Sequence, residues 1–137
     1  AGTYNNAGAA CTTAVEACSW WHHLRQAGFV SGSGASQPFN AVTGILGVQT
    51  GDGAAVTGPV MGAAAGAGGF SGLIICSGNL PDKIAIAVDT QMDDGNRITG
   101  TVRGQLQAAP NPAAAADGTG AAYTETGTNT YLLCRSL

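Results

Sequence analysis

Charge is scarce in this 137-residue chain: only 9% of its residues are charged, and Lys83 is the single lysine. The net charge is −3, and basic residues do not cluster anywhere along the chain. Proteins that bind nucleic acids use such clusters to neutralise phosphates, so the composition argues against that class of partner. Apolar runs are short as well, and none approaches the roughly 18 residues that a membrane-spanning helix needs.

Enzyme motifs are also missing. No nucleophile is paired with a base, and the Gly-x-Ser-x-Gly turn of serine hydrolases is absent. Glycines gather at residues 50–53 and 66–69, but no Lys-Ser or Lys-Thr follows them as in a phosphate-binding loop. We therefore predict a non-catalytic protein that requires no cofactor.

The chain length predicts one domain spanning residues 1–137, large enough to bury its own core. The first residues, Ala1 to Asn6, do not resemble a signal peptide. Composition and length together favour a small secreted or cell-surface domain.

The four cysteines also favour a secreted or cell-surface protein, because disulfides form and persist in oxidising compartments. Their even number and placement favour two disulfides, Cys11–Cys18 and Cys76–Cys134, although four cysteines allow three pairings. Free buried thiols and a metal site are the alternatives. A continuous helix would hold Cys11 and Cys18 about 10 Å apart, too far for a disulfide, so we expect Cys11 to precede the first helix.

That helix is predicted over residues 14–27. Thr13 and Glu16 form a capping-box pattern at its start, and Gly28 is suited to its end. The only two tryptophans, Trp20 and Trp21, lie within it, so we expect this helix to anchor the core. The adjacent His22 and His23 do not have the three- or four-residue spacing of a metal site on a helix, and we interpret them as polar-face residues.

Strands are predicted from alternating apolar residues at 42–48, 70–76 and 128–134. A further strand at 54–61 would contain Pro59, which restricts it to the edge of a sheet. Residues 63–69 and 108–120 are rich in Gly, Ala and Pro and predict loops.

The segment from Pro81 to residue 107 predicts a helix, a sharp turn and a strand. Pro81 suits the first turn of the helix, and Ile84 and Val88 share the face that we expect to be buried. Gly95 should end the helix with a positive φ. Residues 98–107 then alternate between apolar and polar, as in a strand with one buried face.

The turn contains an acidic group: Asp89, Asp93 and Asp94, with Asn96. Its spacing does not match the ligand positions of an EF-hand loop. We interpret the group as an Asx-type turn in which carboxylates accept hydrogen bonds from backbone N–H groups, with a weak calcium site as the alternative.

Two segments resemble type IV pilin-like proteins. One is Ile-Ala-Val-Asp-x-x-Met-Asp-Asp-Gly-Asn-x-x-Thr-Gly-x-Val-Arg, which begins at Ile86. The other is Trp-x-His-Leu-x-x-Ala-Gly-Phe-Val-x-Gly, which begins at Trp21. They occur in the order found in that family. The resemblance implies an α+β pilin-like head, with helices packed on an antiparallel sheet and a disulfide that closes the C-terminal loop.

The function implied by the resemblance is that of a structural subunit in an extracellular filament, serving attachment, motility or uptake. Such subunits meet mainly through a long apolar N-terminal helix, which also anchors the precursor in the inner membrane. We expect the complete gene product to carry this helix upstream of Ala1, and the isolated head to be a monomer. The alternative is a secreted carbohydrate- or surface-binding module that does not polymerise, which exposed aromatics in residues 31–39 or 121–131 would favour.

Overall fold

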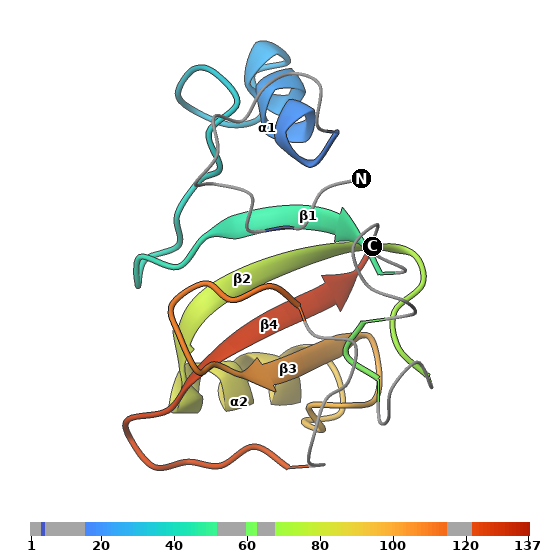
Figure 1. Ribbon diagram of the computed structural model, residues 1–137, viewed down its shortest axis with the longest axis vertical. Coiled ribbons are helices and arrows are strands. Elements are labelled where there is room, and N and C mark those ends of the chain that lie inside the picture. Colours follow the sequence, from blue (N-terminus) through green and yellow to red (C-terminus); the bar gives the residue numbers. More distant parts are fainter. Residues whose placement is uncertain (1–3, 5–15, 52–59, 63–67, 115–121) are drawn as a thin grey trace.

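The computed structural model describes residues 4, 16–51, 60–62, 68–114 and 122–137, with the backbone alone for residues 16–18. Within these residues, two helices and four strands follow one another in the order α1 (Glu16–Gln26), β1 (Leu46–Thr50), β2 (Leu73–Pro81), α2 (Asp82–Met92), β3 (Val102–Leu106) and β4 (Thr130–Ser136). The strands form one antiparallel sheet (Figure 1). The prediction of an α+β fold is therefore confirmed.

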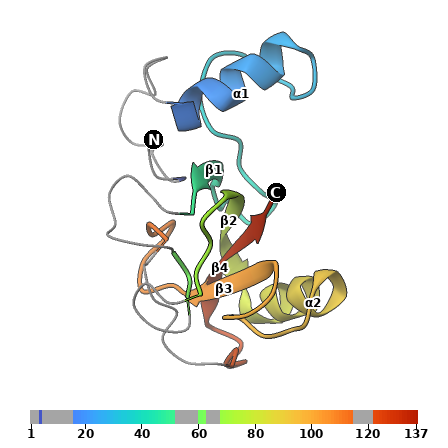
Figure 2. The same ribbon diagram turned by 90° about the vertical axis from the view of Figure 1, so that its right-hand side faces the viewer.

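The sheet has the strand order β1-β2-β4-β3, so the C-terminal strand lies between two strands that precede it in the chain. α2 packs across one face of the sheet, while α1 lies at one end of the molecule beside β1 (Figures 1 and 2). No helix in the described part of the chain is long and apolar enough to cross a membrane.

α1 ends as its sequence predicts. Gly28 has φ = 78°, and the N–H groups of Gly28 and Phe29 donate to the carbonyls of Arg25 and Leu24. These are the two hydrogen bonds of a Schellman motif. Trp21 is buried, with 5% of its surface exposed, but it belongs to neither of the two core clusters. The expected burial of Trp21 is confirmed, while the two clusters among the described residues are built on the sheet rather than on α1.

Two apolar clusters lie on opposite faces of the sheet, because successive strand residues point to opposite sides. β4 shows this alternation directly: Leu132 and Cys134 belong to the first cluster, whereas Tyr131 and Leu133 belong to the second. The first cluster continues into segments outside the strands, through Tyr4, Ile45, Val60, Met61, Phe70 and Ala114. The second cluster includes Ala85 of α2 and Val102 of β3.

The buried face of α2 differs from the predicted one. Ile84 is 44% exposed and Val88 is only half-buried, whereas Asp82, Ala85 and Asp89 are buried. The apolar spacing predicted the wrong face because both carboxylates have hydrogen-bond partners on the inner side, which makes their burial tolerable.

The strand boundaries also differ from the predictions. β2 continues to Pro81, past an irregularity between Ser77 and Leu80 where Asn79 has φ = 57°. β3 begins only at Val102, because the preceding residues form a turn that is closed by Asp93.

β1 begins at Leu46 rather than at residue 42. The side chain of Asn40 accepts hydrogen bonds from the N–H groups of Val42 and Gly44 and closes a turn before the strand. Of the strand predicted at 54–61, residues 54–59 lie outside the described residues, and Val60 forms a single bridge with Phe70.

Candidate functional site

The C-terminal strand is covalently tied to the sheet. Cys76 of β2 and Cys134 of β4 are paired in register and form a disulfide, with S–S 2.06 Å and Cα–Cα 4.0 Å. The disulfide closes a loop between cysteines 58 residues apart, which on the loop-entropy model corresponds to about 4 kcal/mol of stabilisation. This predicted pairing is confirmed. Cys11 lies outside the described residues, and the side chain of Cys18 is not described, so that pairing stays a prediction.

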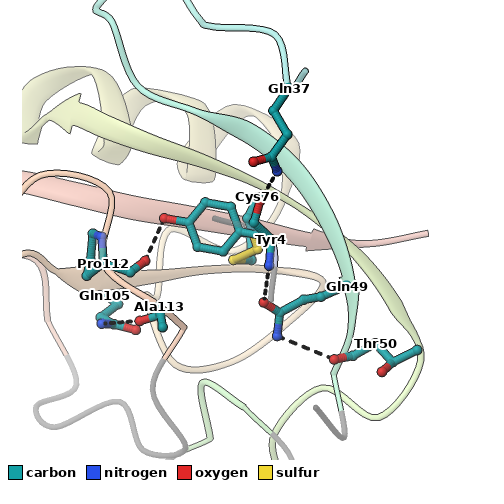
Figure 3. The surroundings of a disulfide bond; sticks show 9 residues. Tyr4, Gln37, Gln49, Thr50, Cys76, Gln105, Pro112 and Ala113 are labelled. Atoms are coloured by element: carbon teal, nitrogen blue, oxygen red, sulfur yellow. Dashed lines mark hydrogen bonds between the residues drawn. A yellow bond between two sulfur atoms is a disulfide. The ribbon is translucent and has the colours of Figure 1, made fainter. Parts of the chain in front are cut away.

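Tyr4 packs against the disulfide from the N-terminal part of the chain (Figure 3). Its N–H donates to Oε1 of Gln49 over 2.9 Å, its carbonyl accepts from the amide of Gln37, and its hydroxyl donates to the carbonyl of Pro112 over 2.7 Å. Burial raises the pKa of the Tyr4 phenol far above its usual value. This face of the sheet is therefore closed by a neutral, fully hydrogen-bonded tyrosine.

On the other face, the acidic turn lies at the C-terminal end of α2. The carboxylates of Asp89, Asp93 and Asp94 have ligand oxygens within 4.8 Å of one another. The structure thus brings together three of the four residues of the predicted acidic group. The fourth, Asn96, takes part in the turn by hydrogen bonds: its N–H donates to Oδ1 of Asp94 over 2.8 Å, and its Oδ1 accepts from the N–H of Ile98 over 3.3 Å.

Each of these carboxylates accepts hydrogen bonds within the turn. Oδ2 of Asp93 accepts from the N–H groups of Thr101 (2.5 Å) and Val102 (2.9 Å). Oδ2 of Asp94 accepts from the hydroxyl of Thr99 over 2.6 Å, and this bond lowers the pKa of Asp94 most strongly. These are the contacts of an Asx-type turn, in which carboxylate oxygens satisfy nearby donors.

Glycine is required at two positions of this turn. Gly95 has φ = 72°, the positive value that the sequence predicted, and so does Gly100. A Cβ on Gly100 would overlap with Oδ2 of Asp93, inside the hydrogen-bonded centre of the turn. The Asp-Asp-Gly-Asn-x-x-Thr-Gly pattern is therefore explained by backbone geometry and close packing.

Asp89 is fully buried and connects the turn to the C-terminal part of the chain. Its Oδ1 accepts from the N–H of Gly95 over 3.1 Å, and its Oδ2 accepts from the hydroxyl of Tyr123 over 2.5 Å. Burial raises the pKa of the Asp89 carboxyl, as do the neighbouring charges of Asp94 and Asp93, while the two hydrogen bonds lower it. Chemically, three clustered carboxylates are suited to a hard cation, but their oxygens already serve as hydrogen-bond acceptors in the turn.

Asp82, at the start of α2, was not among the predicted site residues. Its Oδ2 accepts from the N–H groups of Thr126 (2.8 Å) and Gly127 (2.7 Å), and these bonds lower the pKa of the carboxyl despite its burial. Asp82 and Asp89 therefore hold residues 123–127 against α2 at two points. An aspartate directly after a helix-starting proline was the available signal, but sequence alone does not place its partner more than 40 residues away.

An apolar groove of about 320 Å³ lies between α2 and the same face of the sheet. Side chains from all four strands and α2 line it, with Arg135 as the charged member: Leu46, Ile75, Ser77, Leu80, Val88, Met92, Val102, Leu133 and Arg135. Met92 is 49% exposed, and Leu46, Ile75 and Leu80 are only half-buried. The groove is thus an apolar surface that this chain covers only in part.

The two adjacent histidines belong neither to the acidic turn nor to the apolar groove. His22 is half-buried and His23 is exposed on α1, with their ring centroids 6.0 Å apart. Among the described residues, they do not join any group of metal-ligating side chains.

Comparisons with known proteins add no identification: no family model, no curated protein and no solved structure matches this chain.

Proposed function

We propose that the chain is the head domain of a type IV pilin-like subunit and that it serves as a non-catalytic building block of an extracellular filament at the cell surface. The observation that carries the proposal is the apolar groove between α2 and the sheet. An apolar helix is the type of element that such a filament brings against each head. Covering the groove with such a helix would remove Met92 and its neighbours from water, which is favourable in proportion to the apolar area buried.

The residues that resemble pilin-like proteins support the same proposal. The segment from Ile86 to Arg103 forms most of α2, the acidic turn and the start of β3, so the resemblance falls on the elements beside the groove. The disulfide that ties β4 to the sheet is in keeping with an oxidising, extracellular location. Precursors of this type would be anchored in the inner membrane until assembly.

Two substitutions on one helix test the proposal. In the full-length gene product, Met92→Glu places a charge in the groove, and we expect filament assembly to be lost. Ile84→Glu is the matched control, because Ile84 is 44% exposed, lies on α2 and does not line the groove. Both isolated heads should remain folded. Assembly of normal filaments by the Met92→Glu variant would contradict the proposal.

A secreted binding module is the second candidate, and exposed aromatics favour it. Phe39 is 66% exposed, whereas Tyr131 is buried and Tyr123 is half-buried. Phe39 therefore offers a ring for stacking on a sugar or a surface. If this candidate is correct, Phe39→Ala should abolish retention on the polysaccharide or cell surface that binds the native chain, and Met92→Glu should not.

A further inference from the structure

The last strand of the chain is held on both sides and on both faces. β4 pairs with β2 from Ile74↔Ser136 to Pro81↔Thr130, and with β3 from Val102↔Arg135 to Leu106↔Tyr131. Its four central residues, Tyr131 to Cys134, are buried and contribute to both apolar clusters. Removing β4 would therefore leave a slot between β2 and β3 that is open along its length, with unpaired backbone groups on each side and apolar surface above and below.

The strand that fills this slot arrives late in the sequence. Residues 107–129 separate β3 from β4 along the chain. Pairing between segments so distant in sequence forms slowly, because loop closure precedes any gain from the contacts. Until β4 inserts, the slot is accessible to any extended segment that carries the same side chains.

We propose that the slot between β2 and β3 accepts β4 of a second copy of this chain as well as its own, giving a strand-exchanged dimer. The exchanged strand makes the same backbone hydrogen bonds and fills the same apolar clusters as in the monomer. The balance between monomer and dimer therefore depends mainly on protein concentration and on the path of the connection between β3 and β4. This inference does not depend on the proposed filament.

Once β4 has inserted, the Cys76–Cys134 disulfide locks the chain as either a monomer or an exchanged dimer. In the monomer it joins two positions of one chain, whereas in the exchanged dimer it joins Cys76 of one copy to Cys134 of the other with the same local geometry. With glutathione disulfide as oxidant, the two cysteine thiols lose two electrons and two protons as the protein disulfide forms, and glutathione disulfide takes up both to give two molecules of glutathione.

Isotope mixing tests the proposal on the unmodified sequence. Reduced, unfolded chains that contain either natural or heavy nitrogen are mixed in equal amounts. The mixture is refolded with glutathione disulfide at a series of increasing protein concentrations. Trypsin cleaves after Arg25, Lys83, Arg97, Arg103 and Arg135, so Cys76 and Cys134 fall into separate peptides that do not contain the other cysteines. In a soluble dimer isolated by gel filtration, we expect disulfide-linked pairs of one light and one heavy peptide, with a share that rises with protein concentration.

Mixing the two chains after oxidation is the control, and it should give no mixed pairs. A second arm removes disulfide chemistry: Cys76→Ser/Cys134→Ser chains should form a soluble dimer of light and heavy copies after refolding at high concentration. Two results would overturn the proposal: mixed pairs no more frequent than in the control, or mixed pairs confined to aggregates while the serine variant stays monomeric.

Discussion

The two faces of the sheet are closed in different ways. On one face, Tyr4 and apolar residues from several segments cover the disulfide. On the other, α2 presents buried carboxylates that bind neighbouring loops, and the apolar surface beside it stays open as a groove. The contrast indicates that the first face serves internal stability, whereas the second combines polar attachment points with an apolar surface that we propose a partner covers.

Removing a side chain on each face provides the sharpest contrast. Leu132 is fully buried in the first cluster, so Leu132→Ala should lower the free energy of unfolding by about 2–5 kcal/mol. Met92→Ala in the groove should cost no more than about 0.5 kcal/mol, since the side chain is 49% exposed. Urea unfolding of both variants of the domain measures the difference. Equal losses would mean that the groove is part of the folding core.

The acidic turn gives a smaller effect, which depends on close packing at one glycine. Gly100→Ala adds a Cβ at a positive φ, which costs about 1–2 kcal/mol, and also pushes Asp93 away from its two backbone donors. Gly127→Ala is the matched control, because Gly127 has φ = 79° but open space where a Cβ would lie. Thermal unfolding should rank Gly100→Ala below Gly127→Ala. The same loss in both would show that the Asp93 contact contributes nothing to stability.

The smallest effect concerns pH. The raised pKa of Asp89 means that the folded state binds its proton more tightly than the unfolded chain, so this group favours folding in mild acid and opposes it as the pH rises through its folded pKa. The lowered pKa of Asp82 acts in the opposite sense, and its contribution is lost as the pH falls below the usual carboxyl range.

Asp89→Asn should therefore make unfolding free energy less dependent on pH above the usual carboxyl range, while Asp82→Asn should flatten the acid limb. Urea unfolding at a series of pH values distinguishes the two. Unchanged profiles in both variants would mean that neither carboxyl titrates differently in the folded protein.

Most parts of the fold that were predicted correctly depend on local signals, and the disulfide between cysteines 58 residues apart is the exception. Gly28 ends α1, and Gly95 has the predicted positive φ, because such a φ is read directly from glycine. α2 itself already ends at Met92, with Asp93 as its C-cap. The Cys76–Cys134 pairing followed from cysteine number and placement. The failures concern long-range contacts: apolar spacing alone does not show that Asp82 and Asp89 find donors in residues 123–127, so it selected Ile84 for the buried face of α2.

The candidate site shows the same division. The acidic turn was visible as a sequence pattern, since its donors lie within ten residues of its carboxylates. The groove was not visible, because it is assembled from β1, β2, α2, β3 and β4. Its open state depends on where α2 crosses the sheet, which is a property of the tertiary structure.

The central claim is that this domain belongs to a subunit whose apolar helix covers such a groove in a filament. N-terminal sequencing of the mature protein from its natural source tests it most directly. We predict that the mature chain begins upstream of Ala1 with a long apolar helix. A mature chain that begins at Ala1, after removal of an ordinary secretory signal, would contradict the filament and favour the secreted binding module.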